Sequence, residues 1–329
     1  MALDANQIAY RDKHIEELRE YWVRVSESEG FDIEGIPPVA NGMARRVCRS
    51  DPIEYPYMAM VNSYARMGLH RYNFSHGTHF KFMSVKKFNY TDGCLQSYFI
   101  TLNARDPVTK SQTTFQVGVS EERFAKLHLK CFIARPKGTL KTLKRHRQPH
   151  DIPPKYELPH WPSDLNDTTR FYEVKESELK SNDWIHLYLE LAIVRNDPLI
   201  PAEVLSGLKI VKVSIKTSED VEPNERLQAK SATFYITFKN LANARVGELG
   251  EDVERKVIVR RVVDELTGDF TLFGGFGFYI GEVAEERPMS STSVERPTKR
   301  RRRPPLDWSV LRNQCTFEYE KKHNLPYPK

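Results

Sequence analysis

The run SYFITLNA, residues 97–104, decides the fold class of this 329-residue chain. Its apolar side chains Tyr98, Ile100 and Leu102 recur at every second position, a period typical of a strand with one buried face. Short polar turns rich in Gly, Pro and Asp separate it from similar runs. These are FKFMSVKKF (80–88), TFQVGV (114–119) and LHLKCFIA (127–134). The pattern predicts a four-stranded antiparallel meander.

A helix is expected directly before these strands. The segment YARMGLHRYN, residues 64–73, has the composition of a helix end, and residues 73–77 break it. One helix followed by an antiparallel meander makes an α+β layer pair. We assign residues 63–136 to this first unit.

The N-terminal residues 1–62 are interpreted as a helix and a connector. Gly30 is a suitable helix stop, because glycine adopts the left-handed cap conformation that other residues resist. The connector that follows is polar and contains several prolines. We expect the helix to dock on the body of the protein, with partner binding as the alternative. Its apolar residues recur every three or four positions within residues 9–29: Ile15, Leu18, Trp22 and Val25.

The second half of the chain starts with a basic, proline-rich linker, residues 137–169, and continues as a strand-rich unit, residues 170–281. Alternating apolar residues predict strands at 185–193, 211–215, 234–238 and 253–263. The run ATFYITFKN (232–240) is similar to QSYFITLNA (96–104), which indicates internal duplication, although short strands also look alike by chance. Since no clear helix precedes these strands, we interpret the second unit as a degenerate copy.

Positive charge is concentrated near the C-terminus. The chain has 50 Lys and Arg against 44 Asp and Glu, and residues 296–303 hold six of the cations and no acid. The rest of the chain is therefore balanced, and without a basic face nucleic acid is not an expected partner. Residues 282–329 are assigned to a polar, basic tail. A nuclear-import receptor would recognise its proline-flanked run, for which a solvated charge run and phosphate contact are the alternatives: Lys299, Arg300, Arg301, Arg302 and Arg303.

Several classes of protein are excluded at the level of motifs. No apolar window approaches the length of a membrane span, and the N-terminus lacks the apolar core of a signal peptide. Four widely spaced cysteines include no Cys-x-x-Cys pair, so we expect reduced thiols in the nucleus or the cytoplasm. The glycine-rich stretch 274–281 differs from the dinucleotide fingerprint and is interpreted as a bent strand.

Three histidines, His70, His76 and His79, lie close together in the sequence. No carboxylate or thiol stands at a fixed spacing from them, so solvated or capping roles are favoured over a metal site. The zinc-protease, nucleophile-elbow and Walker motifs do not occur either. We therefore expect no catalytic residue, no metal and no cofactor.

Residues 64–136 resemble the cystatin fold, in the helix end at 65–73 and in the strand runs around Phe82, 98–102 and 115–119. Over nearly its full length the chain is similar to an uncharacterised plant protein family with cystatin-like repeats, one known by an uncharacterised-protein-family (UPF) number. This resemblance implies two helix-on-sheet units, the second degenerate, and brings no known activity with it. It rests on the runs EELREYWVRVSESEGFDIEGIPP (16–38), ARMGLHRYN (65–73) and ATFYITFKNLANARVG (232–247).

Cystatins inhibit papain-type cysteine proteases through an apolar wedge that includes a Gln-x-Val-x-Gly hairpin and a Pro-Trp pair. At the first position this chain has NYTDG, residues 89–93, and at the second SEER, residues 120–123, whose acidic side chains are costly to desolvate unpaired. We expect a non-enzymatic protein-interaction module whose partner the sequence does not identify. An atypical cysteine-protease inhibitor and an enzyme with an unrecognised site are the alternatives. Candidate hairpin contacts are Asn89, Tyr90, Thr91 and Gly93.

Overall fold

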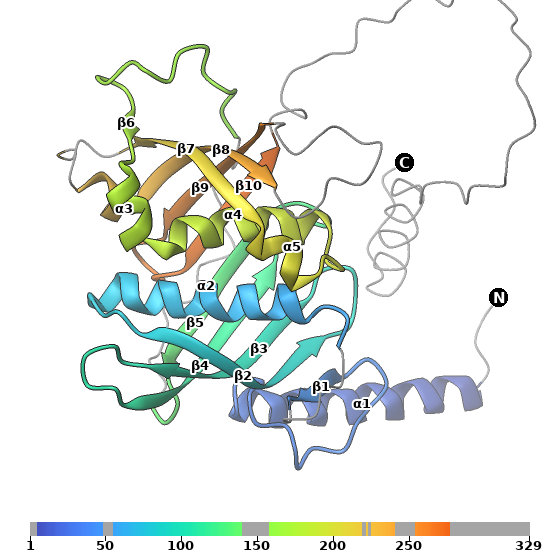
Figure 1. Cartoon of the computed structure of the whole chain (residues 1–329). Helices are drawn as coiled ribbons and strands as arrows, with labels where there is room; N and C mark the ends of the chain where they lie inside the picture. Colours follow the sequence, from blue (N-terminus) through green and yellow to red (C-terminus); the bar gives the residue numbers. More distant parts are fainter. Residues whose placement is uncertain are drawn as a thin grey trace, which may run out of the picture.

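A computed structural model describes residues 5–48, 55–139, 158–218, 222, 225–240 and 254–276. Ten of the described strands form one antiparallel sheet in the order β1-β2-β3-β4-β5-β10-β9-β8-β7-β6 (Figure 1). The expectation of two cystatin-like helix-on-sheet units is therefore wrong. The strands of both halves belong to a single sheet, which makes the fold richer in strand than a cystatin unit.

The first half of the chain contains the meander predicted from the alternating pattern, and its four runs are strands β2 to β5. Helix α2 ends where residues 73–77 predict: Gly77 adopts φ +64°, and its N–H donates to the carbonyl of Asn73. The elements of this half are α1 (Ala5–Glu27), β1 (Met43–Val47), α2 (Met58–His76), β2 (Lys81–Thr91), β3 (Ser97–Arg105), β4 (Gln112–Glu121) and β5 (His128–Pro136).

The second half differs from the prediction at its start. Residues 185–193, expected to be a strand, lie in a helix, so this half also has a helix ahead of its strands. Its elements are β6 (Tyr172–Glu173), α3 (Glu176–Ser181), α4 (Asp183–Asn196), α5 (Ala202–Ser206), β7 (Leu208–Thr217), a 3-10 turn (Arg226–Gln228), β8 (Ser231–Asn240), β9 (Arg255–Val263) and β10 (Phe270–Phe276).

Helix α4 is buried on nearly every side, which explains why residues 185–193 were wrongly predicted to form a strand. A helix that is apolar all round is typical of a protein core, and any such helix contains runs of alternating apolar residues. The alternating apolar residues at 185–193, which predict a strand, are part of this surface of α4. The buried apolar side chains of α4 are Ile185, Leu187, Tyr188, Leu189, Leu191, Ala192 and Val194.

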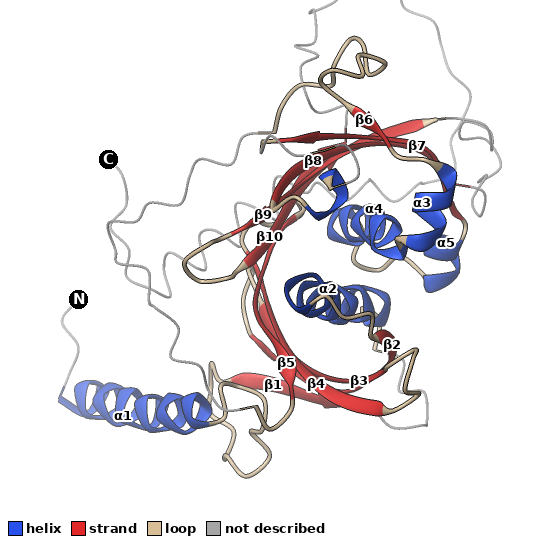
Figure 2. Ribbon diagram, turned by 90° about the vertical axis from the view of Figure 1, so that its left-hand side faces the viewer, coloured by secondary structure: helices blue, strands red, loops and turns tan. Residues whose placement is uncertain are grey.

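The two halves meet along β5 and β10, which pair antiparallel with Cys131 opposite Phe270 and Leu129 opposite Leu272. The sheet curves around α2 and α4, which pack against each other on its concave face (Figure 2). Helix α2 contacts β2, β4 and β5, whereas α4 contacts β9 and β10. One continuous core fills the space between helices and sheet.

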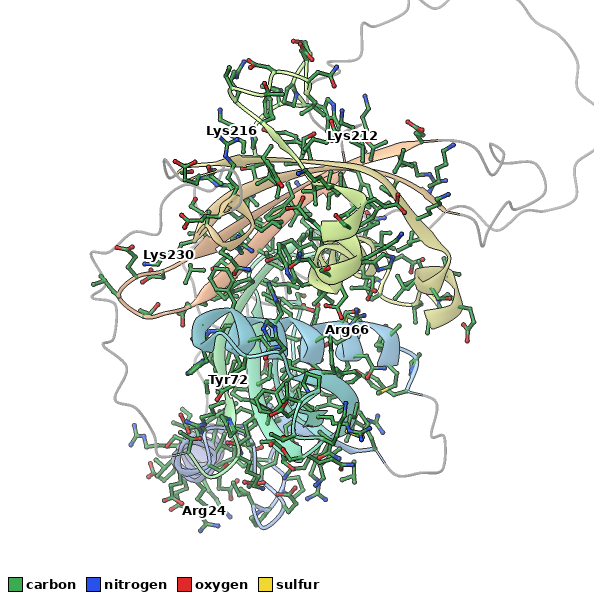
Figure 3. All side chains as sticks on the ribbon, turned by 60° about the vertical axis from the view of Figure 1, so that its left-hand side comes forward. Arg24, Arg66, Tyr72, Lys212, Lys216 and Lys230 are labelled. Carbon is green, nitrogen blue, oxygen red and sulfur yellow. The ribbon has the colours of Figure 1, made fainter. Side chains whose placement is uncertain are left out.

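Polar contacts also join α2 to α4. Arg66 of α2 is directed toward α4 (Figure 3), where its guanidinium lies 2.5 Å from Oε2 of Glu190. The other oxygen of Glu190 lies 2.9 Å from Nδ1 of His186, and Nε2 of His186 lies 3.0 Å from the carbonyl of Leu208. Both ring nitrogens thus face acceptors, and the hydrogen bond with Glu190 raises the pKa of His186 despite its burial. The protonated ring fits this position, because it donates from both nitrogens.

A buried ion pair joins α4 to the end of β4. The guanidinium of Arg195 lies 2.6 Å from Oε1 of Glu121, which also accepts from the hydroxyl of Tyr64 at 2.8 Å. Arg195 donates to the carbonyl of Arg123 as well, at 3.0 Å. Glu121, one of the acidic residues of the segment 120–123, is thereby paired and fixed inside the protein. Desolvation raises its pKa, while Arg195 and Tyr64 favour its ionised form.

The convex face is covered by loops. The side-chain amide of Asn89 donates to the carbonyls of Gly30 and Phe31, at 2.7 and 3.0 Å, and so holds the connector against β2. Among the described side chains of α1, residues 13–27, Tyr21 and Val25 of the last turns dock on the connector and β1, so the expected docking holds for that part of the helix. Apolar side chains of α1 that stay exposed are Ile15, Trp22 and Val23.

Candidate functional site

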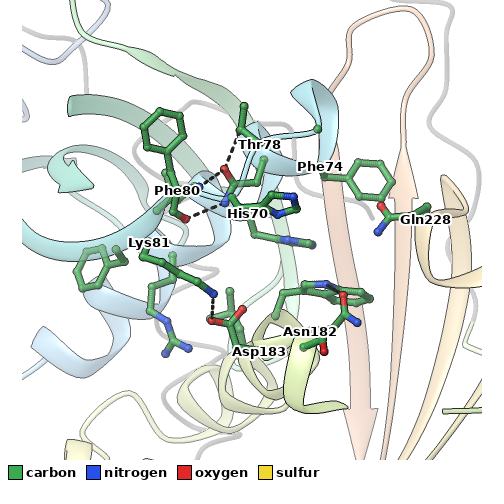
Figure 4. A pocket seen from close by; sticks show the side chains of 17 residues that line it. His70, Phe74, Thr78, Phe80, Lys81, Asn182, Asp183 and Gln228 are labelled. Carbon is green, nitrogen blue, oxygen red and sulfur yellow. Dashed lines mark hydrogen bonds and ion pairs between the residues drawn. The ribbon is translucent and has the colours of Figure 1, made fainter. Parts of the chain in front are cut away.

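A hollow of about 310 Å³ opens between the C-terminal part of α2 and the corner where α3 meets α4 (Figure 4). Aromatic side chains contribute to its walls, with Phe74 and Phe80 from α2 and the turn after it and Trp184 from α4. Polar groups, among them the amide side chains of Asn182 and Gln228, form a similar share of the lining. A concave surface that combines apolar side chains with fixed polar groups can bind a ligand, and this volume lies at the small end of the range for binding sites.

The turn after α2 shapes one side of the hollow. The side-chain oxygen of Asn73 accepts from the hydroxyl of Thr78 at 2.9 Å and from the N–H of Phe80 at 3.0 Å. Its amide group donates to the carbonyl of Phe80 at 2.9 Å. One asparagine side chain therefore fixes residues 77–80 and with them the ring of Phe80.

His70 forms part of the aromatic wall. Its imidazole stacks on the indole of Trp184, with 5.0 Å between the ring centroids and 15° between the planes. Its Nε2 lies 3.0 Å from the hydroxyl of Tyr188. Burial, followed by the charge of Arg261, holds the pKa of His70 well below the usual range of histidine. The ring is thus neutral at physiological pH and serves as an aromatic surface.

Arg261 supports this wall from within the core. Its side chain is completely buried, and the guanidinium lies 4.7 Å from the ring centre of Phe74, 5.2 Å from that of Trp184 and 5.3 Å from that of Phe234. It donates to the carbonyls of residues 227 and 229 at 2.8 and 2.6 Å. Within the described part of the chain no carboxylate pairs with it, so aromatic faces and carbonyls stabilise the charge. Three aromatic side chains are held in fixed positions as a result.

The charged groups around the hollow are paired with one another. Lys81 and Asp183 face each other across its rim at 2.8 Å, and Arg66 is engaged by Glu190. The hydroxyls of Thr78 and Ser181, which line the hollow, donate to the side chain of Asn73 and to a backbone carbonyl of α3. Neither hydroxyl donates to a base, as an activated nucleophile would. The arrangement is suited to binding.

The hairpin residues predicted as contacts lie elsewhere, because they occupy the end of β2 opposite to Lys81. Asn89 is completely buried under the connector, and Tyr90 stacks on Tyr98 with 5.7 Å between the centroids. The hydroxyl of Thr91 accepts from a backbone N–H of β3. Gly93 is exposed in the turn with φ +129°. Of the four, only Gly93 presents itself fully to solvent.

The structure does not bring the three histidines together. His70 is in the aromatic wall, His76 has its Nδ1 3.0 Å from the carbonyl of Tyr72, and His79 lines the hollow. Among the described residues, no group of three or more His, Cys, Asp or Glu side chains is placed to hold a metal ion. The helices of the described ranges include none with the length and apolarity required to cross a membrane.

Other predictions fall outside the described residues. They include the basic run Lys299–Arg303, the tail 282–329 and most of the basic part of the linker, residues 140–157. Sequence reasoning did not identify the hollow. Its residues on α2 were expected in a helix but not at a site, and those on α4 were expected in a strand. A usable signal was Asn182-Asp183 before an apolar run, because short polar residues of this kind mark helix starts.

Comparison with known proteins identifies the family. A sequence profile described as Protein MS5 matches residues 158–272. The crystal structure of MS5 from Brassica napus superposes with a TM-score of 0.51 at 28% identity, covering 68% of this chain and 98% of that one.

Two relatives from Arabidopsis thaliana are closer in sequence. UPF0725 protein At1g02770 is 46% identical over 274 residues, which are 80% of this chain and 85% of that protein. UPF0725 protein At3g19520 is 41% identical over 310 residues, or 89% and 97% of the two chains. The expected resemblance to an uncharacterised plant family is thus confirmed, while its cystatin-like character is not. From these identities and this coverage, the chain belongs to the UPF0725 family of plant proteins.

Proposed function

We propose that this protein is a non-enzymatic protein-interaction module whose hollow between α2 and α4 receives an aromatic or aliphatic side chain of a protein partner. The aromatic wall of His70, Phe74 and Trp184 supports this proposal most strongly, because it is rigid before any ligand arrives. Preorganised apolar pockets that accept one anchor side chain supply much of the binding energy of protein interfaces.

The chemistry around the hollow favours binding over catalysis. His70 is neutral and stacked, and the charges at the rim are neutralised in pairs. His79 is an exposed acid–base group at the hollow, but the two hydroxyls there, of Thr78 and Ser181, donate to other groups and are not activated by it. The partner in this proposal is therefore a protein, and no cofactor is involved.

The indole of Trp184 provides a direct test, since its N–H donates to the side chain of Asn182 at the hollow, at 2.9 Å. Titration with N-acetylphenylalaninamide, followed by NMR of the indole N–H signals, is expected to shift the Trp184 signal. Those of Trp22 and Trp161, which do not line the hollow, should stay in place. N-acetylglutamine amide is expected to have a much smaller effect.

A matched pair of variants controls for indirect effects. Gln228 is exposed and lines the hollow, so Gln228→Trp fills it and should abolish the shift. Gln112→Trp places the same side chain at an exposed position that does not line the hollow, and should leave the shift intact. If the phenylalanine amide at tens of millimolar leaves the Trp184 signal unchanged, the proposal is overturned.

Protease inhibition is disfavoured by the position of the β4–β5 turn. Arg195 of α4 donates to the carbonyls of Arg123 and Lys126 in this turn and pairs with Glu121 at its start. The turn is thus tied to the body and carries buried charge, in contrast to a free apolar wedge. We expect papain to keep its full activity in the presence of the protein, and nanomolar inhibition in a titration would restore the inhibitor alternative.

A further inference from the structure

The outer edge of β7 is only partly covered. Strand β6 has two residues, which pair with Ile215 and Ser214 of β7. One more backbone bond, from the N–H of Val174 to the carbonyl of Val213 at 3.0 Å, follows before the chain turns into α3. Residues 209–212 of β7 therefore have β8 on one side and, within the described residues, no strand on the other. Such an edge is a template for an added strand.

A groove of about 820 Å³ follows this uncovered edge, between β7 and the start of α3. Val174, Leu179, Ile210 and Val211 give it an apolar lining. Val211 is 44% exposed and belongs to a β-bulge, since the register of β7 with β8 shifts between Ile210 and Lys212. Bulges turn side chains away from the regular pleat, which accounts for an apolar residue on the surface here.

Four lysines surround the apolar lining: Lys175, Lys209, Lys212 and Lys239. The two carboxylates of the groove are already engaged, Glu173 with Lys212 at 2.9 Å and Glu176 with Lys180 at 2.8 Å. Within the described ranges, no carboxylate lies within ion-pair distance of Lys175 or Lys209, and both are exposed.

Two of these lysines repel each other when the groove is empty. Lys209 lies directly opposite Lys239 in the β7–β8 ladder, and like charges in cross-strand pairs are destabilising. Glu254, at 3.9 Å from Lys239, and Glu176, whose carboxylate interacts electrostatically with Lys209, offset part of this repulsion. An acidic side chain of a guest would add to this compensation.

We propose that this groove binds an extended peptide segment of a partner protein by β-strand addition to β7, and that the segment alternates apolar and acidic residues. The open edge supplies main-chain hydrogen bonds, and the period of a strand places alternate side chains on the apolar lining and toward the lysines. This inference rests on the proposed function in that the protein binds other proteins, but it uses a different surface, since no residue lines both the groove and the hollow.

The probe for the test is a fluorescein-labelled peptide, Gly-Glu-Val-Glu-Val-Glu-Val-Gly, measured by fluorescence anisotropy with the full chain. Replacing its central Val by Pro removes a main-chain donor and should abolish binding. Labelled polyglutamate carries the charge without the apolar residues and is expected to bind at least tenfold more weakly. Equal binding of polyglutamate would show simple charge attraction and would overturn the inference.

Two protein variants locate the site. Lys209→Glu should weaken peptide binding about tenfold or more, because it reverses a charge in the groove. Lys216→Glu reverses the charge of an exposed lysine on the same strand, beyond the groove, and serves as the matched control (Figure 3). Amide hydrogen exchange at residues 209–212 is expected to slow when the peptide binds to the unaltered protein. Unchanged affinity of Lys209→Glu, or unchanged exchange there, would contradict strand addition at β7.

The two proposals fail separately. Gln228→Trp blocks the hollow and should bind the peptide normally. If the peptide does not bind while N-acetylphenylalaninamide still shifts the Trp184 signal, the groove inference alone is wrong. If the peptide binds and N-acetylphenylalaninamide does not, the proposal that the hollow receives a side chain is wrong.

Discussion

Gly68 lies where α2 packs directly on β4, and it limits how this helix can pack. A Cβ built at this position would lie 2.0 Å from a methyl carbon of Val117 on β4. Gly68→Ala must therefore push α2 away from a core of buried side chains, and overpacking of this kind costs about 1–3 kcal/mol. The free energy of unfolding from urea titration should fall by that amount.

Gly35 provides the control for this substitution. A Cβ at Gly35 meets nothing within 4 Å, so Gly35→Ala should change the free energy of unfolding by less than about 0.5 kcal/mol. Equal stability of the two variants would show that α2 can shift without loss, contrary to the packing described above.

His186 is expected to lower the free energy of unfolding as the pH rises through its raised pKa. Because its pKa is raised in the folded protein, its protonated form is stabilised by folding. This stabilisation is complete below the pKa of histidine in the unfolded chain, about 6.5, and is lost as the pH rises through the raised pKa. The difference in unfolding free energy between the wild type and His186→Gln should therefore shrink as the pH rises above about 6.5.

Exposed His76 serves as the control, since its ring contacts only its own helix turn. His76→Gln is measured over the same pH range for comparison. A difference for His186→Gln that does not change with pH would mean that its hydrogen bonds with Glu190 and Leu208 do not require the charged ring.

At the scale of elements, the Arg195–Glu121 pair is the main polar link between α4 and β4. Breaking a buried pair leaves one charge without compensation, so Arg195→Met should destabilise the protein by about 3–5 kcal/mol. The double variant Arg195→Met with Glu121→Gln should lose less than the single one, because no carboxylate is then buried alone. Chemical denaturation of both variants measures the difference.

Lys180→Met is the matched control for this experiment. Lys180 pairs with Glu176 within the exposed surface of α3, and such pairs contribute little. Its free energy of unfolding should change by less than about 0.5 kcal/mol. A single variant Arg195→Met as stable as this control would refute the linking role of the buried pair.

Strands whose apolar residues alternate were predictable from the sequence, and helix α4, which is buried on nearly every side, was not. The apolar residues Tyr98, Ile100 and Leu102 of β3 lie in the core at every second position, and Gly77 ends α2 with the conformation that glycine favours. For α4 the periodicity carries no information, because the core surrounds it. The hollow depends on α4 and on Arg261, whose aromatic neighbours come from three separate segments, so local pattern could not reveal it.

For the whole molecule, the basic run Lys299–Arg303 predicts where the protein is found in the cell. We expect a fluorescent fusion of the full chain to enter the nucleus, through an import receptor that binds this run. Replacing Arg300 to Arg303 by alanine should make the signal diffuse, since four of the clustered cations are removed. Unchanged localisation of this variant would assign the run to a solvated tail and favour the cytoplasm.

The single sheet is the property of the whole molecule that sequence reasoning missed. Both halves contain a helix and four longer strands, and each half by itself is compatible with a separate unit. Within the sheet, the pairing of β5 with β10 joins them, and contacts between strands so distant in the chain leave no local signature.

This pairing also sets the order of events during synthesis on the ribosome. Strand β5 emerges long before β10, which ends at residue 276, so a nascent chain carries the unpaired edge of β5 while most of the second half is being translated. The last of the described strands to appear closes the middle of the sheet. Premature termination before residue 270 therefore leaves an unpaired strand edge there, and we expect such truncated chains to be bound by chaperones or degraded by proteases.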